Sequence, residues 1–594
     1  MTRPACPAPF PAVLLVLLSI APRAHAAVDE ILTKEARDRL GRIAVLDNHR
    51  VKPFDTFSRE TVKAVTGDEK FGGADPIETV LSWAAHAPDH AKEPLVRVKK
   101  ERLLKERLGI AAGVERVSYD TLDPRKNAAF AELAMAARSK EEKERSTLEN
   151  QAFETWIRFS TLESVFFGTA FRAIPGPGDD PLDWHALADA EGLGTSAEGA
   201  AAGAWQSFFE AYASGDGSLA SRLVLPLAAA LRSVNPAGYP SEKTIGYEVT
   251  LNRTKPFFLA TWTYFLACAL FLGSFIGPAK LFRRAAIAVV LLAAVFHLGG
   301  MTLRILAAGR PPVTNIPETL FWISFGVILF AMIFELITKN RYFGLAGTAL
   351  AGLGLLYFSF CPFPTGINQI APVLRSNYWL TVHVLTVVIS YAALLLAGML
   401  GAIHIWGRVF NAQSRAASAT LMQCLFPAIH IGVLLLAAGT ILGGVWANES
   451  WGRYWGWDPK ETWALITLLW FLAIVHGRIA GYRWFKGLAV SGATVFGAGL
   501  TLFTWWGVNF IPWFVGLHTY AGVSAEEFRL ADVPMAAKLA TLAVVGTLLA
   551  AAAKGFLSRG AAAAGEPSQP DPRAANAADS REGKKPARPS VERV

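Results

Sequence analysis

The chain has 594 residues, of which 52% are hydrophobic and only 18% are charged, and its mean hydropathy is +0.32. These values exceed what a soluble domain usually shows, so the composition favours a protein with several membrane spans. The net charge is +9, but Lys and Arg of the apolar half lie mostly in short loops and the tail, so we expect no nucleic-acid partner. The four cysteines are far apart without a CxxC, so neither a dithiol redox centre nor a zinc site is predicted.

The first residues have the order of a secretory signal. Arg3 precedes an apolar stretch over 10–20, and small residues follow at Ala24 and Ala26. We therefore predict a signal peptide over 1–26, whose cleavage would place the new N-terminus outside the cytoplasm. An uncleaved anchor is the alternative, because only one positive side chain precedes the apolar stretch.

Residues 27–255 mix polar and apolar side chains, and no apolar run is long enough to cross a bilayer. We predict a mainly helical extracytoplasmic domain, and its length allows a core of its own.

From Pro256 onward, apolar segments alternate with short polar loops. Each segment has roughly 20 residues, the length that a hydrocarbon core of about 30 Å requires. We predict a polytopic, mostly α transmembrane bundle of nine spans: 256–276, 285–306, 317–338, 342–360, 378–403, 425–446, 462–480, 488–510 and 535–557.

The loop charges predict the orientation. If the domain before Pro256 lies outside, every loop that falls inside carries positive charge, as the positive-inside rule requires. These charges are Lys280, Arg283 and Arg284; Lys339 and Arg341; Arg408 and Arg415; Arg483 and Lys486; and the tail after Lys554. We therefore expect a cytoplasmic C-terminus, with 558–594 as a disordered tail rich in Ala, Pro and charge.

The predicted outer loop before the seventh span is rich in tryptophan: Trp446, Trp451, Trp455, Trp457 and Trp463. An aromatic belt at the membrane interface accounts for one or two of them. Glycines between the rings, Gly452 and Gly456, allow a backbone to lie close to a flat ligand, which a belt does not need. The pattern therefore favours a platform for a flat cofactor such as a porphyrin.

Part of this motif predicts local structure. Asp458, Pro459 and Glu461 match the N-cap, first-turn proline and N3 acid of a helix that begins the seventh span. We assign no catalytic role to the two acids. Arg453 and Lys460 are candidates to pair with the propionates of haem, although both could equally face water.

Histidines inside membrane segments are costly and often functional. His383 lies near the outer end of the fifth span and His518 in the outer loop after the eighth. Two neutral imidazoles at one level can supply both axial ligands of haem iron.

His476 lies roughly 22 Å below the outer boundary, too deep for that site. It could bind haem near the inner leaflet or serve packing, and for His297 and His430 packing is at least as plausible.

The run from Trp451 to Trp463, with Asp-Pro-Lys-Glu-Thr-Trp at its end, closely resembles the tryptophan-rich signature of the CcsA (ResC) family of System II cytochrome c biogenesis proteins. The resemblance covers about 285–530. It implies that His383 and His518 are axial ligands of haem b, that the tryptophan-rich loop is the haem platform, and that His476 belongs to an inner haem site. The second histidine of that inner site would come from a separate CcsB (ResB)-like subunit, with His297 as a fallback.

The resemblance further implies a component of a cytochrome c synthase (haem lyase) in the bacterial cytoplasmic membrane. It would present haem at the outer face for thioether attachment to the CxxCH motif of apocytochrome c, and no residue of the chain resembles a catalytic acid or nucleophile. Expected partners are the CcsB-like subunit, apocytochrome c, membrane lipid and a thiol-reducing thioredoxin-like protein. Two alternatives stay open: haem export or delivery without ligation, and a membrane scaffold that binds no haem.

Overall fold

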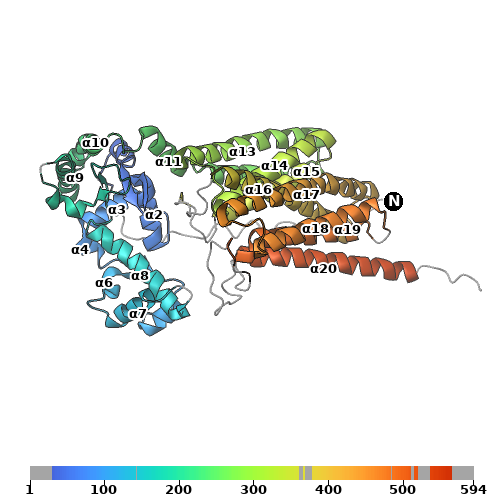
Figure 1. Ribbon diagram of the computed structural model, residues 1–594, viewed down its shortest axis with the longest axis horizontal. Helices are drawn as coiled ribbons and strands as arrows, with labels where there is room; N and C mark the ends of the chain where they lie inside the picture. The colour runs from blue at the N-terminus through green and yellow to red at the C-terminus, as the bar shows by residue number, and fades with distance from the viewer. Residues whose placement is uncertain are drawn as a thin grey trace, which may run out of the picture.

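The computed structural model describes residues 30–141, 144–194, 196–359, 366–367, 377–482, 485–509, 514, 516–518 and 535–564. The predicted signal peptide lies outside these residues. Figure 1 shows two parts side by side, a unit of short helices and a bundle of long ones. We call residues 30–255 the N-domain and residues 256–564 the bundle, and the end of the bundle at which the two meet is its domain-side end.

The N-domain is mainly helical, with three small antiparallel hairpins, β1·β2, β3·β4 and β5·β6. Its elements are α1 (Lys34–Leu40), β1 (Ala44–Asp47), β2 (Arg50–Pro53), α2 (Phe54–Thr66), α3 (Pro76–Ala85), α4 (Ala87–His90), β3 (Pro94–Arg97), α5 (Arg102–Arg107), β4 (Arg116–Ser118), α6 (Tyr119–Leu122), α7 (Ala128–Arg138), α8 (Thr147–Phe166), β5 (Ile174–Pro175), β6 (Trp184–His185), η2 (Leu187–Leu193), α9 (Ala197–Ala213), α10 (Gly217–Val234) and α11 (Glu242–Thr254). One apolar cluster, from Leu32 to Val249, forms its core.

The bundle consists of α12 (Pro256–Gly273), α13 (Ala279–Ala308), α14 (Ile316–Thr338), α15 (Tyr342–Ser359), α16 (Asn377–Val409), α17 (Arg415–Trp451), α18 (Pro459–Ile479), α19 (Leu488–Trp505), η4 (Gly507–Asn509) and α20 (Met535–Ala564). Among the described residues, nine helices are long and apolar enough to cross a membrane. The predicted fold class and the nine spans are confirmed, and the chain is a multi-pass membrane protein.

Several helices extend beyond the predicted spans. α17 begins at Arg415 and continues through Trp451, so Trp451 belongs to a helix and the prediction of a loop directly after Trp446 was wrong. The helix ends only at Gly452, which adopts a left-handed conformation with φ 70°, because apolar length does not stop a helix whereas a glycine C-cap does. α20 likewise runs to Ala564, past the predicted start of the tail at 558.

Buried charges at the domain-side end of α13 and α14 are paired. Glu318 is fully buried; its Oε1 accepts from Nη2 of Arg304 at 3.0 Å, and its Oε2 accepts from Nη1 of Arg310 at 3.1 Å. Thr314 donates to the same carboxylate through its backbone N–H at 2.9 Å. Because an unpaired charge in an apolar bundle is costly, this cluster joins the ends of the two helices.

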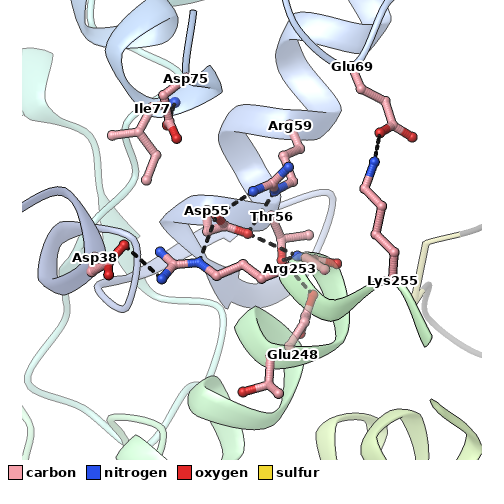
Figure 2. Close-up of polar contacts among 12 residues, drawn as sticks. Asp38, Asp55, Thr56, Arg59, Glu69, Asp75, Ile77, Glu248, Arg253 and Lys255 are labelled. Carbon is pink, nitrogen blue, oxygen red and sulfur yellow. Dashed lines mark hydrogen bonds and ion pairs between the residues drawn. The ribbon is translucent and has the colours of Figure 1, made fainter. Parts of the chain in front are cut away.

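Helix α11 fastens the N-domain to the bundle. Figure 2 shows Asp55 and Thr56 of α2 facing Glu248 and Arg253 of α11. Thr56 donates its hydroxyl to Oε1 of Glu248 at 2.9 Å, and Asn252 donates to Oδ2 of Asp55 at 3.1 Å. Only Lys255 separates α11 from α12, so these contacts hold the N-domain directly against the first span.

The segment Gly366–Ile367 is held from both parts. Asn48 and His49, both with positive φ, form a two-residue hairpin turn that places Arg50 at the start of β2. Arg50 pairs with Glu248 and donates Nη1–H to the carbonyl of Ile367 at 2.8 Å. From the bundle, Nη2 of Arg304 donates to the carbonyl of Gly366 at 2.8 Å.

We predict that Glu248→Ala lowers the stability of the N-domain by about 3 kcal/mol, since it leaves the guanidinium of Arg50 without its buried partner. The midpoint of thermal unfolding should fall by roughly 5–10 °C. The matched control is Glu242→Ala on the same helix, because Glu242 forms an exposed pair with Arg232 and exposed pairs contribute little. Equal midpoints for the two variants would contradict the prediction.

Candidate functional site

The predicted site residues gather at the domain-side end of the bundle. His383 lies in the second turn of α16, Trp446 and Trp451 lie in the last turns of α17, and His518 lies in the segment 516–518. These positions are far apart in sequence. They meet because α16 and α17 are antiparallel neighbours and the chain returns to the same end after α19.

The indole of Trp446 is the common contact of the two histidines. It is 2% exposed and stacks on the imidazole of His383, with ring centroids 6.0 Å apart and planes at 11°. Its centroid is 5.9 Å from that of His518, and His518 also meets Trp451 edge-on at 4.9 Å. The structure therefore brings His383 and His518 to one indole.

His383 is held by the backbone of α17. Its Nδ1 lies 2.9 Å from the carbonyl oxygen of Gly439, and this oxygen can only accept, so Nδ1 carries the proton. Gly443 lies against the same imidazole, where an added Cβ would be 2.5 Å from Cε1. Gly439 thus supplies the acceptor and Gly443, one turn later, the space for this ring, which was not recognised in the sequence.

His518 is held by Asp458. Its Nδ1 lies 2.9 Å from Oδ1 of Asp458, and the same oxygen accepts the backbone N–H of Lys460 at 3.0 Å. The predicted cap is correct, since Asp458 and Glu461 form a capping box at the start of α18. The contact with His518 was missed, because nothing near Asp458 in the sequence indicates a partner sixty positions later.

The environment of Asp458 favours its charged form. Burial would raise the pKa of this carboxyl group, but the hydrogen bond and charge of His518, with backbone N–H groups of Lys460 and Leu517, bring the pKa below its usual value. An ionised Asp458 requires a proton on Nδ1 of His518. In the neutral form of both histidines, Nε2 is then the nitrogen with a free lone pair, the form that binds a metal.

The remaining tryptophans do not form one surface with Trp446. Trp455 and Trp457 meet edge to face at 5.8 Å, and Trp457 is 68% exposed. Trp463 packs on Phe503 and Phe514, with centroids 4.5 and 5.9 Å away. The predicted platform thus divides into an inner pair beside the histidines, an outer pair, and one ring packed against α19.

The two glycines of the motif have local roles. Gly452 ends α17, and an added Cβ there would meet nothing within 4 Å. Gly456 lies against the guanidinium of Arg453, so a side chain at 456 would displace it. In the structure they end a helix and contact an arginine, and the expectation that they let the backbone approach a flat ligand stays a prediction.

The two candidate cations lie next to this site. Arg453 is 3.6 Å from Glu461 and 5.8 Å from the ring of Trp451, and its buried Nη1 has no hydrogen-bond partner among the described residues. Lys460 is half-buried in the first turn of α18. Arg453 therefore lies beside the inner tryptophan pair, and Lys460 lies beside Asp458, the partner of His518.

His476 and His297 lie on different helices and differ in burial. His476 is exposed on α18, and its Nδ1 bonds to the carbonyl of Leu472 in its own helix at 2.8 Å. His297 is fully buried on α13, among Phe257, Tyr264 and Phe325. In Figure 1, α16 and α17 separate α13 from α18. The ring contacts of His297 are those of a packing residue, although its Nε2 is buried with no hydrogen-bond partner among the described residues. The fallback of His297 as a second inner ligand stays a prediction.

The inner part of the site suits an iron porphyrin. Two imidazoles present unprotonated Nε2 atoms, the ligands that haem iron accepts in many proteins. The indole Nε1 of Trp446 is buried without a hydrogen-bond partner among the described residues, so its neighbours leave a polar atom for another group to meet.

Comparison with known proteins identifies the family. The sequence model described as "Cytochrome C assembly protein" matches residues 313–516. A cytochrome c biogenesis protein CcsA from Synechococcus elongatus is 33% identical over 269 residues, which cover 36% of this chain and 81% of that protein. The chain belongs to the CcsA family. The CcsA protein of Synechocystis is similarly related, at 31% identity over 282 residues and 82% of its length.

Family membership gives the chain a role in cytochrome c biogenesis, and the resemblance drawn from the tryptophan-rich motif is confirmed. Protein NrfI of Wolinella succinogenes is 29% identical over 491 residues, or 80% of this chain. The chain spans about half of that relative, 53% of its length.

The backbone of Trp457 is strained, with φ 56° in a region that residues with a side chain rarely adopt. We predict that Trp457→Gly is more stable than Trp457→Ala by about 1 kcal/mol, because glycine avoids the left-handed penalty. Thermal unfolding of the two purified variants measures the difference. A higher midpoint for the alanine variant would contradict it.

Proposed function

We propose that this chain binds haem b at the domain-side end of the bundle and presents it to apocytochrome c for thioether attachment. The observation that supports this most is the meeting of His383 and His518 at Trp446, each with its Nδ1 proton donated to a protein oxygen. Two such imidazoles can both offer Nε2 to one iron.

The haem supplies two vinyl groups, and each cysteine thiol of a CxxCH motif adds across one of them, sulfur to one carbon and hydrogen to the other. The protein needs no acid or nucleophile of its own for this addition. His383 and His518 hold the iron, and Trp446 and Trp451 cover the ring with apolar surface. Arg453 and Lys460 pair with the propionates.

The orientation follows from the loop charges. We propose that the domain-side end and the N-domain lie on the outer side of a bacterial cytoplasmic membrane, because the basic loops lie at the other end of the helices. The haem site is then on the side where c-type cytochromes receive their haem.

His476 supports a second haem site shared with another subunit. It lies on an exposed stripe of α18 with Ile466, Leu469 and Ala473, opposite the face that packs through Phe471 and Ile474. A ligand for the other side of a haem at His476 therefore has to come from outside this bundle. We propose that a CcsB (ResB)-like subunit provides it, and that a thioredoxin-like protein keeps the substrate thiols reduced.

We predict that His383→Ala and His518→Ala each abolish the six-coordinate absorption spectrum of the purified protein and lower haem retention roughly tenfold or more. Added imidazole should restore the spectrum by occupying the vacated position. The control is His430→Ala, an exposed histidine of α17 outside this site.

Unchanged spectra in both variants would refute the assignment of these ligands. A wild-type protein that is folded and binds no haem would favour a membrane scaffold. Haem binding without attachment, tested with the CcsB-like subunit in a strain lacking its own biogenesis genes, would favour delivery alone.

For the second site, we predict that the chain co-purified with its CcsB-like subunit contains one more haem than the chain alone. His476→Ala should remove that extra haem and leave the spectrum of the first site intact. Haem-to-protein ratios of the two preparations measure this. An extra haem in the chain alone, or its retention in the His476→Ala complex, would contradict the shared site.

A further inference from the structure

The two histidines of the site are held by chemically different acceptors. Nδ1 of His518 donates to the carboxylate of Asp458, and Nδ1 of His383 donates to the backbone carbonyl of Gly439, both at 2.9 Å. A hydrogen bond to an ionised acceptor is about twice as strong as one between neutral groups. It also draws the Nδ1 proton away from the ring and makes Nε2 a stronger electron donor toward a metal.

Asp458 is firmly positioned for this role. It is 6% exposed, caps α18 and accepts the backbone N–H of Lys460. Gly516 lies against it and leaves the space for its carboxylate, since an added Cβ at Gly516 would be 2.1 Å from its Oδ2. The carboxylate therefore joins the start of α18 to the segment that presents His518.

His383 differs from His518 in how its ring contacts Trp446. Its ring lies nearly parallel to the indole of Trp446, at 11°, in the space left by Gly443. An imidazole released from a metal can rest in this stacked position with its Nδ1 proton still donated to the carbonyl of Gly439. His518 instead meets Trp446 at 53° and Trp451 at 86°.

We propose that the two axial histidines are unequal: Asp458, acting through His518, makes His518 the retained ligand and leaves His383 as the ligand that the histidine of the substrate's CxxCH motif replaces. This inference rests on the proposed haem site. Asp458 is a positioning residue in it and does not touch the haem.

The test variant is Asp458→Asn in the full-length protein, because asparagine caps a helix as well as aspartate does and removes only the charge. The control is Glu461→Gln, which removes a charge from the same capping box; Glu461 bonds to the backbone of Gly456 and Asp458 and not to His518. The first readout is the haem midpoint potential. If the preference of His518 for ferric over ferrous iron becomes tenfold weaker, the haem midpoint potential rises by about 59 mV.

The proposal expects a larger positive shift for Asp458→Asn than for Glu461→Gln. The shift in midpoint potential caused by Asp458→Asn should disappear in a His518→Ala protein supplied with imidazole. It should persist in a His383→Ala protein supplied with imidazole. Equal shifts in the two single variants, or a shift that persists without His518, would overturn it.

The second readout is haem retention in the single histidine variants without added imidazole. His383→Ala, which keeps the ligand bonded to Asp458, should retain several-fold more haem than His518→Ala. The opposite order would overturn the assignment of His383 as the replaceable ligand. Absence of haem from the wild-type protein would refute the proposed function itself and is distinct from both outcomes.

Discussion

The contact of both histidines with the indole of Trp446 is the constraint on which the site depends. Trp446 is buried at the end of α17, so its position follows from how α17 packs on α16. His383 on α16 and His518 both contact this ring, with centroids 6.0 and 5.9 Å away. A shift of either helix would separate the imidazoles, and the long helix pair therefore acts as the rigid support that a two-ligand site requires.

Buried, paired charges connect the N-domain to the bundle. Arg310, Glu318 and Arg304 form an ion cluster, and Arg304 also interacts electrostatically with Glu248, the partner of Arg50. Positive and negative groups alternate from α14 to β2. Because each charge is shielded from water, each needs its neighbour, and the two parts are joined by more than the single residue between α11 and α12.

The tryptophan-rich stretch from Trp446 to Trp463, which includes the motif that identified the family, contains residues of several kinds. Trp446 and Trp451 contact the histidines, Trp463 packs on α19, Gly452 ends a helix, and Asp458 both caps α18 and holds His518. A run of similar residues in sequence therefore does not imply one shared surface. Side chains a few positions apart on a turn between two helices point in different directions.

Sequence alone determined the nine spans, the capped start of α18 and the family, because apolar length, cap residues and a dense motif are local properties. It also selected His383, His518 and the tryptophans as candidates. Only the tertiary structure decided which of them meet: that Trp446 contacts both imidazoles, that Asp458 bonds to His518, and that His297 is buried on α13 whereas His476 is exposed on α18. These contacts join residues dozens of positions apart, and they depend on how the helices pack rather than on any pattern within one of them.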